Sequence, residues 1–156
     1  MVVKKHVSVQ KRSNTNPLPS SQAALNRMLA AKSKNTAPEI ALRSELFRSG
    51  FRYRVDVRPV KTLNRRADIV FRSARVAVFV DGCFWHGCPV HGTQAKANSA
   101  FWRRKIKRNQ QRDVDTTQQL KQAGWTVIRI WEHENPIEAS KRIGTVIMKQ
   151  TKKNLH

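Results

Sequence analysis

The 156-residue sequence is poor in acidic residues and contains only two cysteines, Cys83 and Cys88. Two cysteines cannot build the disulfide framework of a small secreted domain, which leaves metal binding or free thiols as their roles. No apolar run approaches the roughly 20 residues that span a bilayer, and the basic, polar first 20 residues lack the apolar core of a secretory signal. These absences predict a cytoplasmic protein without a membrane-spanning segment.

Positive charge dominates what remains. The chain has 31 Lys and Arg against 10 Asp and Glu, which gives a net charge of +21. Such a field attracts polyanions and speeds their capture, so DNA, RNA and anionic membranes are candidate partners. No long helix pairs basic residues with a clean apolar face, which disfavours the membrane. An architectural or ribosome-like binder without catalytic activity remains open at this point.

The length predicts one domain and a monomer. Residues 1–20 are basic and rich in polar residues and proline, and they predict a flexible arm that orders on a phosphate backbone. Residues 21–150 carry the alternation of apolar and polar residues that a folded domain needs, and residues 151–156 form a basic tail.

The predicted elements are a short helix over 21–33, a helix from Pro38 to Gly50, strands over 51–57, 67–71 and 76–80, a long helix over 98–123, a strand over 125–131 and a helix over 136–150. Residues 72–75 form the turn between the second and third strands. These two strands are apolar on both faces, which indicates a sheet covered by helices on both sides. The fold class is therefore a three-layer α/β domain with a mixed central sheet. The expected inward residues are Ile40, Leu42, Leu46 and Phe47; Phe51, Tyr53, Val55 and Val57; and Trp102, Ile106, Val114 and Leu120.

Both cysteines lie in the segment DGCFWHGCPVH, residues 81–91. Thiolate and imidazole are the ligands that tetrahedral zinc prefers, and Cys83, Cys88 and His91 offer three of them. His133 is the best candidate for a fourth, because the strand before it would return it to the sheet. A closed site of this kind would be structural and would staple the loop to the sheet. Two buried free cysteines beside two surface histidines are the alternative.

The same region holds candidate catalytic groups. Asp68 opens one predicted strand and Asp81 ends the next, so both carboxylates would lie at one end of the sheet if these strands pair. Oxygen ligands of this kind hold Mg²⁺ while leaving positions open for water and substrate. His86 is then free for proton transfer near neutral pH. The alternatives are two solvent-facing aspartates and an unused loop histidine.

Phe84 and Trp85 admit two interpretations. Large aromatic side chains are costly to expose, which favours a place in the core. Apolar side chains also act as wedges that unstack a base step in DNA-distorting proteins.

Taken together, the motifs resemble one family. ADIVF, DGCFWHGCPVH, FWRRKIKRNQQRD, QAGWTVIRIW and EH occur in the order seen in the very short patch repair (Vsr) endonucleases, and the upstream segment from Arg27 to Val55 is also similar. The resemblance covers about residues 25 to 135. It implies a restriction-endonuclease-like fold and a Mg²⁺-dependent, strand-specific nick 5′ to the thymine of a T:G mismatch, the lesion left by deamination of 5-methylcytosine.

The resemblance also implies residue roles. Asp68 matches the metal-binding aspartate, His86 the histidine that acts as general base or acid, and Glu39 an acidic residue near the metal. Cys83, Cys88, His91 and His133 fall on the structural zinc site. Phe84 and Trp85 match aromatic residues that enter the DNA at the mismatch, and Met28 matches a residue that approaches from the opposite groove.

Two departures from the family pattern concern the metal centre. Asp81 stands where the best-known members have histidine, so it is expected to bind Mg²⁺ directly or through water. The lysine that restriction-like nucleases carry two residues later is replaced by Cys83, which makes His86 the main proton handler.

The basic residues of the long helix are expected to hold the DNA backbone, with a solvated helix face as the alternative: Arg103, Arg104, Lys105, Lys107 and Arg108. Two rival functions remain, a related nuclease with another target and a DNA-binding module without activity. Mismatch-repair proteins are possible further partners, and the bacterial nucleoid is the expected location.

Overall fold

The computed structural model describes residues 17–31 and 33–155. Most of the predicted basic arm, residues 1–16, therefore lies outside the described part of the chain.

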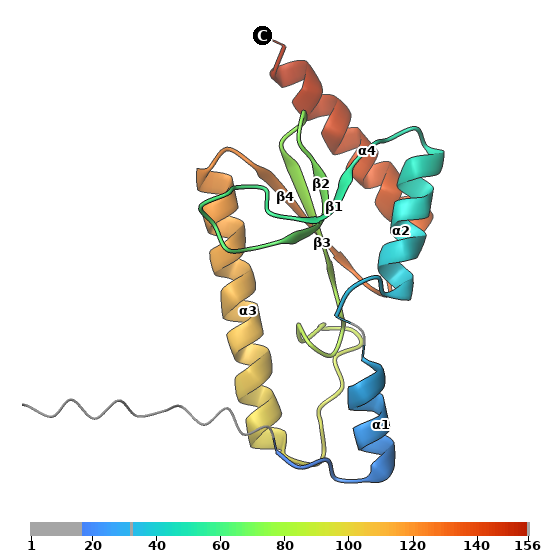
Figure 1. The fold of residues 1–156 in the computed structure, drawn as a ribbon, viewed down its shortest axis with the longest axis vertical. Helices are drawn as coiled ribbons and strands as arrows, with labels where there is room; N and C mark the ends of the chain where they lie inside the picture. Colours follow the sequence, from blue (N-terminus) through green and yellow to red (C-terminus); the bar gives the residue numbers. More distant parts are fainter. Residues whose placement is uncertain (1–16, 32, 156) are drawn as a thin grey trace, which may run out of the picture.

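A four-stranded mixed sheet forms the centre of the molecule (Figure 1). Its strands are β1 (Arg54–Val57), β2 (Ala67–Phe71), β3 (Val76–Asp81) and β4 (Thr126–Trp131), in the spatial order β1-β2-β3-β4. The first two neighbouring pairs are antiparallel and β3 pairs with β4 in parallel. Residues 72–75 make the predicted tight connection, and Arg75 adopts the left-handed region there, with φ 51°.

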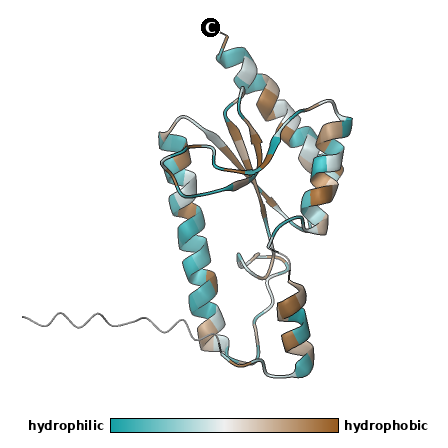
Figure 2. Ribbon diagram, viewed as in Figure 1, coloured by the Kyte–Doolittle hydropathy of each residue, from teal (hydrophilic) through white to brown (hydrophobic). Residues whose placement is uncertain are grey.

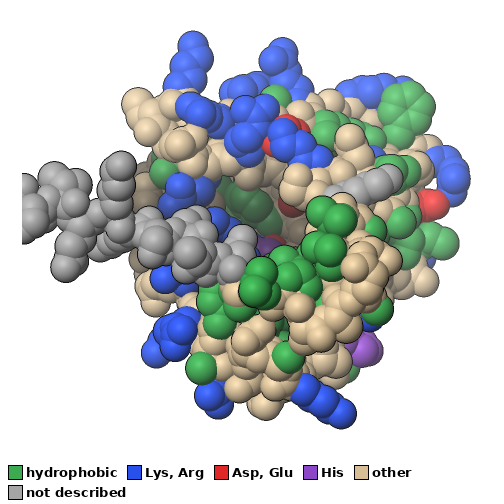
Figure 3. Space-filling model, turned by 60° about the horizontal axis from the view of Figure 1, so that its bottom comes forward, with side chains coloured by type: hydrophobic (Ala, Val, Ile, Leu, Met, Phe, Trp, Pro, Cys, Tyr) green, Lys and Arg blue, Asp and Glu red, His purple; other side chains and the backbone are tan. Residues whose placement is uncertain are grey.

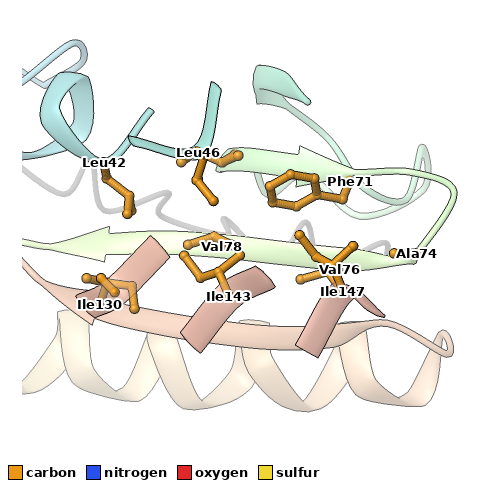
Figure 4. Close-up of a cluster of buried hydrophobic side chains, with 11 residues drawn as sticks. Leu42, Leu46, Phe71, Ala74, Val76, Val78, Ile130, Ile143 and Ile147 are labelled. Atoms are coloured by element: carbon orange, nitrogen blue, oxygen red, sulfur yellow. The ribbon is translucent and has the colours of Figure 1, made fainter. Parts of the chain in front are cut away.

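Helices cover both faces of this sheet, as the apolar strands predict. The helices α2 (Ala37–Arg48) and α4 (Pro136–Lys153) lie together on one side, while α3 (Ser99–Gln122) runs along the other (Figure 1). The larger core lies between the sheet and the first pair; Figure 4 shows it, with Leu42, Leu46, Val78 and Ile143 at its centre. The smaller core under α3 includes Val70, Ala77 and Leu120. The predicted three-layer α/β architecture is confirmed to this extent.

Several expected inward residues are in fact exposed. On α2, Leu42 and Leu46 face the sheet, but Ile40 is 50% and Phe47 is 58% exposed. Leu42 and Leu46 are four residues apart and share one face of the helix, whereas Ile40 and Phe47 lie on other faces. The Arg52 guanidinium covers the ring of Phe47, with 4.1 Å between the guanidinium carbon and the ring centroid. On α3, Val114 was wrongly assigned to the core, because Thr116 and Leu120 occupy the buried face.

The first strand is shorter than predicted, because pairing begins only at Arg54. Phe51 and Tyr53 pack against the larger core, while Val57 packs against the smaller one on the opposite side. Asp56 between them has a φ of 49°, and this left-handed turn of the backbone breaks the alternation that would have put them on one face. Val55 is 37% exposed.

The remaining helices differ from the predictions only at their ends. The short helix α1 (Gln22–Ala30) is capped by Ser21, whose hydroxyl accepts from the Ala24 amide. α4 continues through the first residues of the predicted basic tail to Lys153. Hydrophobic residues concentrate on the strands, and hydrophilic residues cover most of α3 (Figure 2). None of the helices in the described residues is long and apolar enough to cross a membrane.

Candidate active site and metal centre

Two carboxylates meet at one end of the sheet, as their places in the sequence predict. Asp68 is the second residue of β2 and Asp81 is the last residue of β3, and the two strands are antiparallel neighbours. The Oδ2 atom of Asp68 accepts a hydrogen bond of 2.7 Å from the backbone N–H of Val80. Among the described residues, its Oδ1 atom accepts no hydrogen bond, so one carboxylate oxygen remains for a ligand.

Asp68 is in an environment that disfavours its charge. Burial raises its pKa to about 6 from an ordinary 3.8, the Val80 amide opposes the rise, and the charges of Glu39 and Asp81 add to it. A carboxylate that is crowded by other carboxylates and half-shielded from water fits a divalent cation, because the cation would relieve both costs. Asp68 is therefore a candidate ligand for a divalent cation, and the ligand atoms of Asp81, His86 and Asp113 also lie within 4.8 Å of one another.

Glu39 is buried at the start of α2, with 8% of its surface exposed. Its Oε2 accepts from the Asn35 amide at 2.9 Å and its Oε1 from the Thr36 hydroxyl at 3.0 Å. Thr36 in turn caps the helix, because its hydroxyl accepts from the Glu39 amide. The charge of Glu39 acts on Asp68, and its position is fixed by the helix end.

Asp81 is also buried, at 6% exposed, but both of its oxygens are engaged. Arg129 on β4 donates to Oδ2 from Nε at 2.7 Å and to Oδ1 from Nη2 at 2.9 Å. Within the described part of the chain, Asp81 thus forms an ion pair with a cationic side chain, and Asp68 forms none.

His86 lies beside this pair, in the loop after β3. Its Nδ1 is 2.5 Å from Oδ2 of Asp113 on α3 and 3.7 Å from Oδ1 of Asp81. Two further side chains of α3 hold the loop backbone: Asn109 donates to the Trp85 carbonyl at 2.9 Å and Gln110 to the His86 carbonyl at 3.2 Å. The helix thus fixes both the backbone and the ring of the histidine.

Gly87 permits this close approach of the loop to α3. Its φ is +63°, and a Cβ atom there would come within 2.6 Å of the Gln110 side chain and 2.9 Å of Ile106. A side chain at this position would both strain the backbone and push the loop off the helix.

The second cluster contains the four predicted zinc ligands. One ligand atom from each of Cys83, Cys88, His91 and His133 lies within 4.8 Å of the others. The Nδ1 atom of His133 is 3.1 Å from the sulfur of Cys83 and 3.7 Å from that of Cys88. These separations suit four tetrahedral bonds of about 2.0–2.3 Å, and the donor set is the one zinc prefers. The structure thus brings together side chains 50 residues apart into a fitting metal site.

The aromatic residues of the loop form a cluster with a residue of α3. Ring centroids of Phe84, Trp85 and Trp102 lie 5.3 to 5.7 Å apart in edge-to-face arrangements. Trp102 was expected in the core, but like Phe84 and Trp85 it lines a cavity of about 620 Å³ whose opposite wall is α1 with Met28. The aromatic rings are therefore half-buried at the surface, on the side from which α1 approaches.

Basic side chains surround this region. Arg103, Arg104, Lys107 and Arg108 are exposed on α3, while Lys105 lies over the rings, 5.4 Å from the centroid of Trp85 and 5.3 Å from that of Trp102. Figure 3 shows Lys and Arg side chains around a hollow on this face, with hydrophobic side chains beside it.

Two residues of the site, Asp113 and Arg129, were not identified as functional from the sequence. Asp113 is the first carboxylate on the long helix and follows a run of basic and amide residues. An acidic residue after such a run is a signal that the sequence offers. Arg129 interrupts the otherwise apolar strand TVIRIW, and a charge inside a buried strand calls for a buried partner.

Comparison with known proteins places this chain in a family. The model of the family "DNA mismatch endonuclease Vsr" matches residues 20–91. The chain is 47% identical over 124 residues to the Type II nicking enzyme V.NaeI of Lentzea aerocolonigenes, covering 78% of this chain and 75% of that one. It is 33% identical to the Type II nicking enzyme V.HpaIIP of Haemophilus parainfluenzae, covering 76% and 85%. It is 34% identical to the DNA mismatch endonuclease Vsr of Escherichia coli (strain K12), covering 67% and 66%. The chain belongs to the Vsr family of DNA endonucleases.

Proposed function

We propose that this protein is a Mg²⁺-dependent, strand-specific DNA mismatch endonuclease that nicks 5′ to the thymine of a T:G pair. The proposal rests mainly on one juxtaposition. A carboxylate with a free oxygen, Asp68, lies at the same sheet end as a histidine–carboxylate pair. Phe84 and Trp85 of the histidine's loop form an aromatic cluster with Trp102 of the basic helix α3.

Asp68 would hold Mg²⁺, with the charges of Glu39 and Asp81 nearby; the ion supplies charge neutralisation at the scissile phosphate and at the leaving 3′ oxygen. Asp81, whose oxygens are held by Arg129, would contribute its negative charge beside the ion. The exposed arginines and lysines of α3 bind the flanking phosphates and give an affinity that falls steeply with salt.

His86 handles the proton. With Nδ1 donating to Asp113, the Nε2 atom of the ring is left to orient the attacking water and accept its proton. Asp113 fixes the ring and favours this tautomer. No lysine stands at the position two residues after Asp81, so the task falls to the histidine.

The loop after β3 carries both His86 and the aromatic residues Phe84 and Trp85. A zinc ion bound by the four predicted ligands would fix this loop: Cys83, Cys88, His91 and His133. Phe84 lies between the two cysteines in the sequence and Trp85 follows it, so a closed tetrahedral site restrains the aromatic cluster and His86 together. The mixed four-stranded sheet with helices on both faces supports a restriction-endonuclease-like fold. A DNA substrate places the working enzyme at the nucleoid in the cytoplasm.

Substitution of His86 or Asp113 tests the proposed role of this pair in proton transfer. His86→Ala is expected to lower the single-turnover nicking rate on a T:G duplex by about 10²- to 10⁴-fold, because a positioned general base contributes about that much. Asp113→Asn should lower it by at least about 10-fold with little change in DNA affinity. Asp115→Asn is the control, since Asp115 accepts a hydrogen bond from Gln119 on the same helix and has no other side-chain partner among residues 17–31 and 33–155. Nicking by His86→Ala at the wild-type rate would remove His86 from the mechanism.

The aromatic cluster is expected to open the mismatch. Trp85→Ala should slow nicking of a T:G duplex by roughly 10- to 100-fold, because stacking on an aromatic ring contributes about 1–3 kcal/mol per base. The loss should be much smaller on a duplex in which the same thymine is already unpaired in a bulge. Val90→Ala, at an exposed position of the same loop, is the control. An equal loss on both duplexes would mean that Trp85 serves only the core.

A Vsr-like nicking enzyme with another DNA target is the second candidate. Relatives with 33% to 47% identity carry the name Type II nicking enzyme, which favours it. Nicking profiles on matched and mismatched duplexes with varied flanking sequences separate the two functions, and addition of mismatch-repair proteins tests whether they act with it.

A further inference from the structure

Arg129 lies beside the proposed catalytic residues, but the proposed reaction gives it no role beyond holding Asp81. It lies on β4 directly opposite Phe79 of β3, and its guanidinium carbon is 4.8 Å from the centroid of the Phe79 ring. The side chain is 25% exposed. An arginine in this position is held by a ring beneath it and by acceptors at its edge.

The guanidinium joins two carboxylates from different elements. It holds Asp81 of β3 through hydrogen bonds from Nε and Nη2, and the same Nη2 forms an ion pair of 2.8 Å with Oδ1 of Asp113 on α3. The other oxygen of Asp113, Oδ2, is the atom 2.5 Å from the His86 ring. Asp113 therefore lies between Arg129 and His86, with one oxygen committed to each.

We propose that Arg129 is a positioning residue for the nicking reaction, which fixes Asp113 and through it the tautomer and orientation of His86. The inference rests on the proposed function, since it gives His86 a proton to handle. An aspartate at the end of a two-bond side chain can rotate; a second bond to a planar guanidinium removes that freedom. Arg129 thus connects the sheet to α3 at the point where the histidine needs a rigid partner.

The competing explanation is that Arg129 only offsets the buried charge of Asp81. Removing Arg129 would then unbalance Asp81 and harm the fold, without any specific effect on His86. The two explanations differ for a lysine, which restores the charge but lacks the fork that spans two carboxylates.

The test compares Arg129→Lys, Arg129→Met, Asp81→Asn and the double variant Asp81→Asn/Arg129→Met. Arg142→Met is the control, because Arg142 forms an ion pair of 2.9 Å with Glu134 at the surface, away from Asp81 and Asp113. Single-turnover nicking and DNA affinity are measured on a T:G duplex. We expect Arg129→Lys to fold and to bind DNA within about threefold of wild type but to nick about 10- to 100-fold more slowly. The double variant should nick at least about 10-fold more slowly than Asp81→Asn alone.

Wild-type nicking by Arg129→Lys would overturn the inference, as would a double variant as active as Asp81→Asn. If Arg129→Met fails to fold, Arg129→Lys and the charge-balanced double variant still distinguish the two explanations.

A nitrogen-15 spectrum of the histidine rings tests the same link without catalysis. In the wild type we expect one tautomer of His86, protonated at Nδ1, and in Arg129→Lys a mixture of both. An unchanged tautomer would contradict the inference. Suppose that the wild type nicks no duplex, but that Arg129→Lys still changes the tautomer of His86. The proposed function would then be refuted, while the effect of Arg129 on the His86 ring would stand.

Discussion

Asp68→Asn is expected to abolish detectable nicking and, at the same time, to make the metal-free protein more stable at neutral pH. Nicking fails because Asp68 carries the free carboxylate oxygen that would bind Mg²⁺. The fold improves because asparagine can still accept the hydrogen bond from the Val80 amide but bears no charge that burial penalises. Loss of activity with a gain in stability is the mark of a residue kept for function.

The pH dependence follows from the pKa of Asp68, which is raised from 3.8 to about 6 in the folded state. Between these values the folded state binds more protons than the unfolded state, so the contribution of Asp68 to stability falls as pH rises from about 4 to 6. Above about pH 6 Asp68 is ionised in both states, and its burial lowers the free energy of unfolding by about 3 kcal/mol. Asp68→Asn should therefore match the wild type near pH 3.8 and exceed it in free energy of unfolding at pH 7.

Denaturant unfolding of both proteins in the presence of a chelator measures the difference, with Asp115→Asn as the control. Addition of Mg²⁺ should then stabilise the wild type and leave Asp68→Asn unchanged, because binding to the folded state alone raises stability by mass action. If Asp68→Asn were less stable than the wild type at pH 7, the carboxylate would be structural and the metal assignment would fall.

Loss of one buried zinc ligand is the second large effect. Cys88 is 3% exposed, and its sulfur also accepts a hydrogen bond of 3.4 Å from the His91 amide. Cys88→Ser is expected to release the metal and to cost about 4 kcal/mol or more in the free energy of unfolding, because the loop would lose the tie between β3 and β4. DNA nicking should fall with it, since His86 and the aromatic cluster lie on the same loop.

Elemental analysis of the purified wild type should show one zinc per chain, and a strong chelator should lower its melting temperature toward that of Cys88→Ser. Val90→Ala, in the same loop, should retain the zinc. Wild-type protein that contains no zinc and melts unchanged in chelator would show that the two cysteines are free thiols.

The general architecture could be predicted from the sequence because its signals are local. Apolar runs marked β2 and β3 as strands covered on both faces, and Gly50 and Gly124 marked the ends of helices, each with a positive φ. The grouping of the four candidate zinc ligands was also predicted, since zinc prefers thiolate and imidazole ligands. The four side chains indeed come together from the loop and from the end of β4.

What could not be predicted depends on the rotation of helices and on partners distant in sequence. The apolar pattern of α2 did not show that Ile40 and Phe47 would face outward, because four apolar residues fit more than one helix face. Arg129 and Asp113 meet only after β4 pairs with β3 and α3 crosses behind the sheet. Asp81 was expected beside a metal ion, and only the fold shows that an arginine occupies both of its oxygens.

The most direct test of the central claim is a nicking assay that maps the cut on a T:G duplex and its matched T:A counterpart, with Mg²⁺ and with a chelator, for the wild type and Asp68→Asn. The account predicts one nick, 5′ to the thymine, made only by the wild type, only in the T:G duplex and only with Mg²⁺. Nicking that is equal on the matched duplex, or that persists in Asp68→Asn, would contradict it.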